Sequence, residues 1–133
     1  MTLKEAFAKA GIYPVIHPGE VWKASDSSIS LIDKLTRHWH NQRYCVILSN
    51  EEMCADADWP LVLIAPLTHQ LGPKPKPDLI IERTDKNGLA VKSRIILSQI
   101  QTLRKTDLRE KVGEISLTNW EQVIRYVFWH IQR

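Results

Sequence analysis

Two apolar runs decide the fold: Arg43-Tyr44-Cys45-Val46-Ile47-Leu48-Ser49 and Leu61-Val62-Leu63-Ile64-Ala65-Pro66-Leu67. Both runs have the length of a β-strand and are rich in β-branched and aliphatic residues. Their apolar residues follow one another instead of alternating with polar ones, which is typical of strands buried on both faces. An acidic loop is predicted between them, over residues 51–59.

Three further strands are predicted around this pair. Gly19–Ala24 alternates in polarity, and the segments Leu79–Arg83 and Leu89–Leu97 flank Lys86-Asn87-Gly88. Asn-Gly between two strand-like runs indicates a tight hairpin, because both turn positions need a positive φ. Strands that follow one another without alternating helices predict an α+β, mainly β fold. We expect a small antiparallel barrel or curved sheet of about five strands.

Helices are predicted at three places. Thr2-Leu3-Lys4-Glu5 is a capping box for a short N-terminal helix, and a capping box at Thr118-Asn119-Trp120-Glu121 begins a C-terminal helix that closes the fold. The apolar residues of 29–39 recur at near-helical spacing, so an inserted helix is plausible there. We therefore expect one domain, with residues 1–18 as an N-terminal extension and 19–133 as the barrel and its closing helix.

Composition limits the functional classes. The chain has 133 residues, of which 44% are hydrophobic and 25% charged, and a net charge of +3. These values are ordinary for a globular domain and exclude wholesale disorder. No apolar run approaches the ~20 residues of a membrane-spanning helix, so no membrane partner is expected. Two cysteines cannot form a disulfide framework, which favours a reduced, cytoplasmic protein. The net charge permits nucleic-acid binding without requiring it.

Several common chemistries lack their motifs. There is no glycine-rich phosphate loop, and Cys45 and Cys54 have no metal-ligand companion at a suitable spacing. His38-Trp39-His40 lacks an acidic or cysteine neighbour that would complete a metal site. We therefore expect neither a metal nor a cofactor.

Four segments, in order, resemble the MazF/PemK family of bacterial toxin endoribonucleases. They are Gly19–Trp22, Gln42–Asn50, Ile64–Thr68, and Ser93–Leu108 with its core Gln99-Ile100-Gln101-Thr102-Leu103. The resemblance covers about residues 19 to 131. It implies a twisted antiparallel barrel of SH3-like type with a C-terminal helix, usually a homodimer, and a cognate antitoxin as protein partner.

The resemblance also implies a site and a reaction. The family's arginine and threonine that face the scissile phosphate fall on Arg43 and Thr68. The implied reaction is metal-independent cleavage of single-stranded RNA. A ribose 2′-hydroxyl attacks the adjacent phosphorus and leaves a 2′,3′-cyclic phosphate and a 5′-hydroxyl. A forked, permanently charged guanidinium suits the charge that builds on the phosphate oxygens, and a hydroxyl adds a hydrogen bond.

The sequence departs from the family pattern at four positions. Tyr44 stands where the family has proline, His69 where it has serine, Ser98 where it has an acidic residue, and Gln101 where it has arginine. These changes leave an alternative open: a catalytically silent interaction module on the same fold. Such a module would bind a protein, such as a topoisomerase-like target, or a nucleic acid.

The attacking hydroxyl needs a base, and histidine ordinarily titrates near neutral pH. We predict that His69 or His40 lies near Arg43 and shares the proton transfers; the alternative for each is a solvent-facing loop histidine. Trp39 either stacks on unpaired bases or packs the inserted helix onto the barrel. The predicted catalytic residues are Arg43, Thr68 and His69, and the predicted RNA-binding residues are Lys23, Trp39, His40, Gln42 and Gln99.

One basic, proline-rich segment, Gly72-Pro73-Lys74-Pro75-Lys76-Pro77, remains. It has the composition of a polyproline ligand, but a stiff surface connection is the better interpretation in so short a domain. Its lysines offer generic attraction for phosphate, and a solvated loop is the default.

Overall fold

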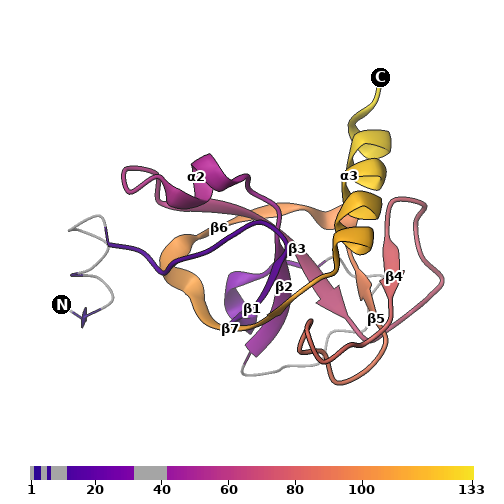
Figure 1. Cartoon of the computed structure of the whole chain (residues 1–133), viewed down its shortest axis with the longest axis horizontal. Helices are drawn as coiled ribbons and strands as arrows, with labels where there is room; N and C mark the ends of the chain where they lie inside the picture. Colours follow the sequence, from indigo (N-terminus) through magenta and orange to yellow (C-terminus); the bar gives the residue numbers. More distant parts are fainter. Residues whose placement is uncertain (1, 4–5, 7–11, 32–41) are drawn as a thin grey trace.

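The computed structural model describes residues 2–3, 6, 12–31 and 42–133 of the chain. Seven strands form one antiparallel sheet, and a C-terminal helix packs against it (Figure 1). The strands are β1 (Glu20–Ser25), β2 (Gln42–Ile47), β3 (Leu61–Thr68), β4 (Leu79–Ile81), β5 (Ser93–Ile95), β6 (Gln101–Arg104) and β7 (Leu108–Glu114). The helices are α2 (Glu51–Ala55) and α3 (Leu117–Ile131), with 3-10 turns η1 (Asp26–Ser28), η2 (Leu97–Gln99) and η3 (Lys105–Asp107).

The mainly β antiparallel fold with a closing helix is confirmed, but the sheet is not a closed barrel of five strands. Its order is β4-β5-β3-β2-β1-β7, and β6 pairs with β3 beside that path. β5 and β6 pair with the two halves of one edge of β3, because η2 interrupts the chain between them. β7, which pairs with β1, is the other strand that the sequence did not predict.

The ends of the sheet meet through a loop. The Glu114 amide donates a hydrogen bond to the Lys86 carbonyl (2.8 Å). A Cβ on Gly113 would lie 2.3 Å from that same carbonyl oxygen, so the two backbones approach each other only because this position carries no side chain. Strand pairing therefore leaves the sheet open, and a backbone contact between the 82–92 loop and the end of β7 brings its edges together.

The tight hairpin predicted at Asn87-Gly88 is wrong. β4 and β5 do pair, but residues 82–92 lie between them, and only Gly88 has a positive φ (71°). The Asn87 side chain is buried and organises the longer loop: its Oδ1 accepts hydrogen bonds from the amides of Thr84 (3.0 Å) and Leu89 (3.1 Å).

The central strands are buried on both faces, as predicted. Cys45 and Ile47 of β2 point into one hydrophobic core, and Val46 points into a second. β1 divides in the same way, with Trp22 in the first core and Val21 in the second. Val123 brings α3 against the second core. A residue-by-residue alternation between two apolar layers explains why the runs of β2 and β3 are continuously apolar.

Both described helices begin at residues that cap them. The Ser116 hydroxyl accepts a hydrogen bond from the Asn119 amide (3.0 Å), so the N-cap of α3 lies two residues before the predicted one at Thr118. The predicted acidic loop contains α2, which Asn50 caps by accepting from the Met53 amide (2.9 Å). Figure 1 shows α3 projecting beyond the sheet to the C-terminus.

Two predicted helices fall largely outside the described residues. Most of the helix predicted over residues 29–39 falls on residues 32–41, and most of the predicted N-terminal helix falls on 1, 4–5 and 7–11, none of which the structure describes. The described part of that segment includes a hydrogen bond from the Ala6 amide to the Thr2 carbonyl (3.0 Å). In the part of the chain that the structure describes, no helix combines the length and the apolarity needed to cross a bilayer.

Buried charges fasten the segments around the first core. The Lys105 ammonium is fully buried and donates to the carbonyls of Met53 (2.8 Å) and Asp56 (2.9 Å), and burial lowers its pKa. Burial also acts on the Glu20 carboxyl by raising its pKa. Hydrogen bonds to Glu20, led by the one from Lys111, outweigh this effect and hold its pKa below the ordinary value.

Candidate active site

A pocket of about 250 Å³ opens where β2, the end of β3 and the 82–92 loop meet. Four of the predicted site residues line it together: Gln42, Arg43, Thr68 and His69. Its other lining residues are Tyr44, Leu67, Leu89, Ala90, Val91 and Ser93. Residues that are far apart in the sequence thus contribute polar and charged groups to one hollow with apolar walls.

Strand register brings Arg43 and Thr68 together. β2 and β3 are antiparallel, with Cys45 opposite Pro66. Continuing this register by two residues places Arg43 opposite Thr68, and an even step along both strands keeps their side chains on the same face. Both side chains are buried, each 9% exposed. The arginine and the hydroxyl therefore occupy facing positions at the end of two paired strands.

Asp26 holds the Arg43 guanidinium. Arg43 Nε lies 2.5 Å from Asp26 Oδ1, and the carboxylate is itself only 3% exposed. Asp26 belongs to η1, the turn that follows β1, so the ion pair ties that turn to β2. A charge-assisted hydrogen bond at Nε fixes the plane of the guanidinium. Sequence reasoning missed Asp26, because one acidic residue in a run of serines carries no signal.

His69 stands at the rim of the pocket, exposed and directly after Thr68. Thr68 Oγ1 accepts a hydrogen bond from the Gln70 amide (3.1 Å), which turns the chain just beyond the histidine. The opposite wall, Leu89 to Ser93, was also missed by the sequence. It is part of the loop that Asn87 organises, and that loop was expected to be a two-residue turn.

Two other predicted RNA-binding residues lie outside this pocket. Lys23 forms an ion pair with Glu110 of β7 (3.7 Å) and lies 5.8 Å from the centre of the Tyr44 ring. Gln99 belongs to η2, and it is not among the lining residues. Trp39 and His40 fall outside the described residues, so their predicted roles stay predictions.

Gln101, at the position where the family pattern has arginine, has a structural contact here. Its side-chain oxygen accepts from the Ser30 amide (2.8 Å), and its side-chain nitrogen donates to the Ser30 carbonyl (2.9 Å). This double hydrogen bond fastens the chain just after η1 to the start of β6. Gln101 therefore supports the turn that carries Asp26, which in turn holds Arg43.

A second buried arginine lies beside the site. Arg94 is the cross-strand neighbour of Thr68, and its Nε lies 3.6 Å from Asp78 Oδ2, with both side chains almost fully buried. Arg94 Nη1 also donates to the Pro73 carbonyl (3.2 Å). The pair anchors the β3–β4 connection next to the pocket. Neither residue was predicted, because nothing in the sequence distinguishes a charged residue that is buried from one that is exposed.

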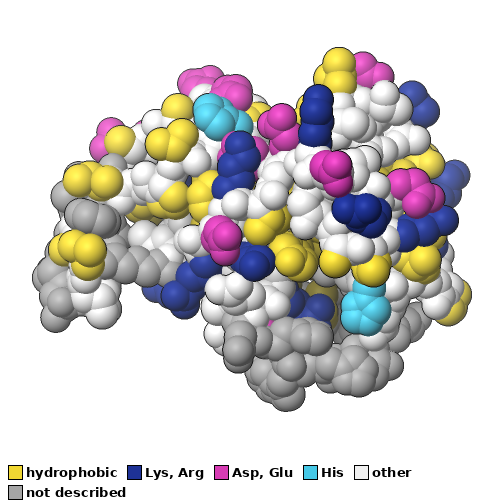
Figure 2. Space-filling view, turned by 60° about the horizontal axis from the view of Figure 1, so that its bottom comes forward, with side chains coloured by type: hydrophobic (Ala, Val, Ile, Leu, Met, Phe, Trp, Pro, Cys, Tyr) yellow, Lys and Arg dark blue, Asp and Glu magenta, His cyan; other side chains and the backbone are white. Residues whose placement is uncertain are grey.

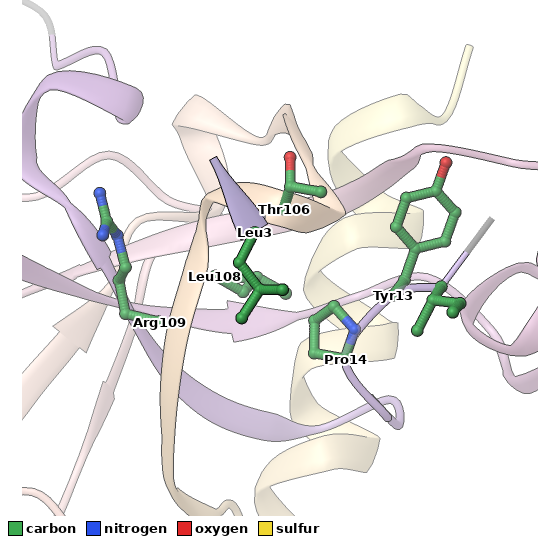
Figure 3. Close-up of a pocket in the computed structure, with 7 residues that line it drawn as sticks. Leu3, Tyr13, Pro14, Thr106, Leu108 and Arg109 are labelled. Atoms are coloured by element: carbon green, nitrogen blue, oxygen red, sulfur yellow. The ribbon is translucent and has the colours of Figure 1, made fainter. Parts of the chain in front are cut away.

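A larger hollow of about 570 Å³ lies elsewhere and contains none of the predicted residues. Leu3, Pro14 and Leu108 form much of its apolar lining, with Thr106 and Arg109 beside them (Figure 3). Among the described residues, no group of three or more His, Cys, Asp or Glu side chains is placed to hold a metal ion. The polar chemistry that sequence analysis anticipated is therefore found in the smaller pocket.

Charge is distributed in small groups over the surface. On the face shown in Figure 2, Lys and Arg side chains alternate with Asp, Glu and hydrophobic ones instead of forming one continuous basic patch. This pattern agrees with the modest net charge of +3.

Comparison with solved structures shows the same fold in bacterial toxins. MazF (Form-I) from Deinococcus radiodurans has a TM-score of 0.67 and 14% identity, covering 90% of this chain and 99% of its own. The Mycobacterium tuberculosis toxin MazF-mt6 has a TM-score of 0.62 and 16% identity, covering 82% and 92%. An endoribonuclease in complex with its cognate antitoxin, from Mycobacterial species, has a TM-score of 0.61 and 13% identity, covering 86% and 91%.

Sequence comparison assigns the family. No curated protein matches the chain significantly. The family model for PemK-like, MazF-like toxins of type II toxin–antitoxin systems matches residues 17–128, which include every strand and most of α3. The chain therefore belongs to the PemK-like, MazF-like toxin family of type II toxin–antitoxin systems.

Proposed function

We propose that this protein is a metal-independent, sequence-selective endoribonuclease that acts as the toxin of a toxin–antitoxin pair. The observation that carries the proposal is the meeting of Arg43, Thr68 and His69 in one pocket. Family membership supports it, and one solved structure of similar fold is an endoribonuclease from Mycobacterial species. The proposed substrate is single-stranded RNA, whose ribose supplies the 2′-hydroxyl nucleophile.

Each side chain has a role in the proposed reaction. Arg43, held in place by Asp26, neutralises the non-bridging phosphate oxygens as negative charge develops on them. Thr68 contributes a hydroxyl hydrogen bond to the same phosphate group. His69 takes the proton from the 2′-hydroxyl or returns one to the 5′-oxygen that leaves. The phosphorus–oxygen bond to that 5′-oxygen breaks as the bond to the 2′-oxygen forms, which yields the 2′,3′-cyclic phosphate.

The test is cleavage of a mixed-sequence RNA in the presence of EDTA. Wild-type protein is expected to leave 2′,3′-cyclic phosphate and 5′-hydroxyl ends, and Arg43→Ala is expected to cut at least ~100-fold more slowly. His69→Ala is expected to change the pH profile as well as the rate. Equal cleavage by wild type and Arg43→Ala, or no cleavage by wild type, would contradict the proposal.

The alternative function, a catalytically silent interaction module, is favoured by one observation. Gln101 uses its amide to bind the Ser30 backbone, so the position where the family pattern has arginine is committed to a structural contact. Expression of the protein distinguishes the two functions. Growth arrest with intact cellular RNA supports the interaction module, whereas arrest accompanied by RNA cut at defined sites supports the ribonuclease.

We further propose that the toxin is a cytoplasmic homodimer that its antitoxin binds. Solved structures of similar fold include MazE-MazF from Deinococcus radiodurans and an endoribonuclease with its cognate antitoxin. The surface for the second copy is an exposed apolar stripe along α3, made of Leu117, Ile124, Phe128 and Ile131. Light scattering is expected to find a dimer for wild type and for the Trp59→Glu control, and a monomer for Phe128→Glu.

A further inference from the structure

A second pocket, of about 400 Å³, lies between the β3–β4 connection and α3. It is lined by Lys74, Lys76 and Pro77 of the connection and by Arg125, Tyr126 and Trp129 of the helix. Figure 1 shows this connection running alongside α3. None of these residues lines the candidate active site, and the apolar stripe of α3 lies on a different side of the helix.

Three cations face this pocket without neutralisation. Within the described part of the chain, no carboxylate lies within 4.0 Å of the charged nitrogens of Lys74, Lys76 or Arg125. Elsewhere in the same ranges many surface lysines and arginines are paired, as Lys92 is with Glu82 (3.2 Å). Like charges gathered around one hollow repel one another and attract an anion.

Aromatic rings accompany these cations. Lys76 Nζ lies 4.4 Å from the centre of the Trp129 ring, and the Trp129 side chain remains 43% exposed. Tyr126 is half-buried beside it. A basic groove with exposed rings is the combination that binds single-stranded nucleic acid, because phosphates contact the cations and bases stack on the rings.

The lysines project from an anchored loop. The buried Arg94 binds the Pro73 carbonyl (3.2 Å), and the Asp78 amide donates to the Pro75 carbonyl (3.2 Å). Three prolines, at positions 73, 75 and 77, further restrict the backbone. The loop thus presents Lys74 and Lys76 at defined places, so ligand binding costs little additional conformational entropy in the loop.

The same connection begins at the candidate active site. His69 lines that pocket and Lys74, five positions later in the chain, lines this one. Five steps along the backbone span at most ~18 Å. A strand of a few nucleotides is therefore long enough to reach from one pocket to the other along this loop.

We propose that the pocket between residues 74–77 and α3 binds the backbone and one base of single-stranded RNA, as a second subsite that holds the substrate beside the cleavage pocket. Lys74, Lys76 and Arg125 contact phosphates, and Trp129 stacks on a base. The identity of the RNA as substrate rests on the proposed ribonuclease function; the binding itself does not. RNA fits better than an acidic peptide, because a peptide carboxylate uses the cations but leaves the exposed indole face without a planar partner.

The test is binding of a fluorescein-labelled 2′-O-methyl RNA of about 15 nucleotides and mixed sequence, a length suited to single-strand sites. It lacks a free 2′-hydroxyl, so the full-length wild-type protein binds it without cutting it. Fluorescence anisotropy is measured between about 50 and 200 mM salt. For Lys74→Gln with Lys76→Gln, the slope of log affinity against log salt is expected to fall in magnitude by about 1.4, because each phosphate contact on a single strand contributes ~0.7.

Matched controls separate this pocket from general charge and from any exposed indole. Lys86→Gln with Arg109→Gln removes the same charge from two exposed residues that do not line the pocket. The salt slope of this control is expected to stay closer to the wild-type slope than that of the Lys74→Gln, Lys76→Gln variant. Trp129→Ala is expected to weaken binding about 5-fold or more, the loss of one base stack. Trp59→Ala removes an indole that is 42% exposed and is expected to change the affinity by less than about 2-fold.

Equal slopes for the two double variants would overturn the proposal. It would also be overturned if the lysine variant lost affinity for poly-glutamate but not for the oligonucleotide, because the pocket would then select an acidic peptide. The outcome is separable from that of the proposed function. If the protein binds the oligonucleotide as expected but cuts no RNA, the second subsite is supported and the proposed ribonuclease function is contradicted. If the protein cuts RNA but the pocket variants bind the oligonucleotide like wild type, the ribonuclease function is supported and the subsite is contradicted.

Discussion

Replacing Asp26 with alanine tests how the candidate catalytic arginine is held. The Arg43–Asp26 pair is almost fully buried, at 9% and 3% exposure. Removing one partner of a buried ion pair takes the stabilisation of the pair away from the other charge and costs about 3–5 kcal/mol. With a urea m-value of ~1.5 kcal/mol per M for a domain of this size, Asp26→Ala is expected to lower the unfolding midpoint by about 2–3 M.

A double-mutant cycle isolates the interaction. Asp26→Ala with Arg43→Met removes both charges of the pair, so the double variant is expected to be much more stable than the sum of the single effects predicts. We expect a coupling free energy of at least about 2 kcal/mol. Urea unfolding of the wild type, both single variants and the double variant, followed by tryptophan fluorescence, measures it.

The exposed pair Arg83–Asp85 provides the control. Its atoms lie 3.3 Å apart, but the side chains are 54% and 101% exposed, so solvent screens the attraction. The same cycle there, with Arg83→Met and Asp85→Ala, is expected to give no more than about 1 kcal/mol. Should the cycle at Arg43 and Asp26 be no larger than this control, Asp26 does not hold the arginine, and the argument for an oriented guanidinium is refuted.

Three further predictions follow from the packing. Gly113→Ala is expected to lower the free energy of unfolding by about 1–3 kcal/mol, because the new Cβ would collide with a loop carbonyl. Gly72→Ala, whose Cβ would have its nearest contact at 3.8 Å, is the control, and the urea unfolding midpoints of the two variants are compared. The fold lowers the pKa of Glu20, so the stabilisation from its carboxylate is complete above the ordinary pKa near 4.5 and is lost as the pH falls through the lower folded pKa. Glu20→Gln is expected to flatten this part of the plot of unfolding free energy against pH. An unchanged plot would contradict the reasoning. Burial raises the pKa of Cys45 to about 12 and that of Cys54 to about 11, so both thiols are expected to resist a disulfide reagent at about pH 8 until urea unfolds the protein; rapid native labelling would count against it.

The sequence predicted the elements whose signals are local. Apolar runs located β2 and β3, because residues that alternate between two cores are apolar at every position. Helical spacing located α3, although Ser116 caps it and Thr118 does not. Arg43 lies near the start of β2 and Thr68 at the end of β3, and antiparallel pairing brings these residues, 25 positions apart in the sequence, into one pocket.

What the sequence could not predict depends on contacts between distant segments. The predicted strand Leu89–Leu97 contains β5 but not β6, and β6 is defined by its pairing with the other half of the same edge of β3. Asn-Gly suggested a two-residue turn, but the buried Asn87 side chain stabilises a longer loop. The buried pair of Arg94 and Asp78 was missed for a similar reason, since burial of a charge is decided by its tertiary partner.

The contact between the 82–92 loop and the end of β7 also bears on when the site is assembled. Leu89 to Ser93 form one wall of the candidate active site, and the Glu114 amide fastens the same loop at Lys86. During synthesis, Arg43 and Thr68 leave the ribosome well before Gly113 and Glu114 do. We expect the wall to become fixed only when β7 has been made and paired with β1. A growing chain would then carry its arginine and threonine without a complete pocket until β7 has been made.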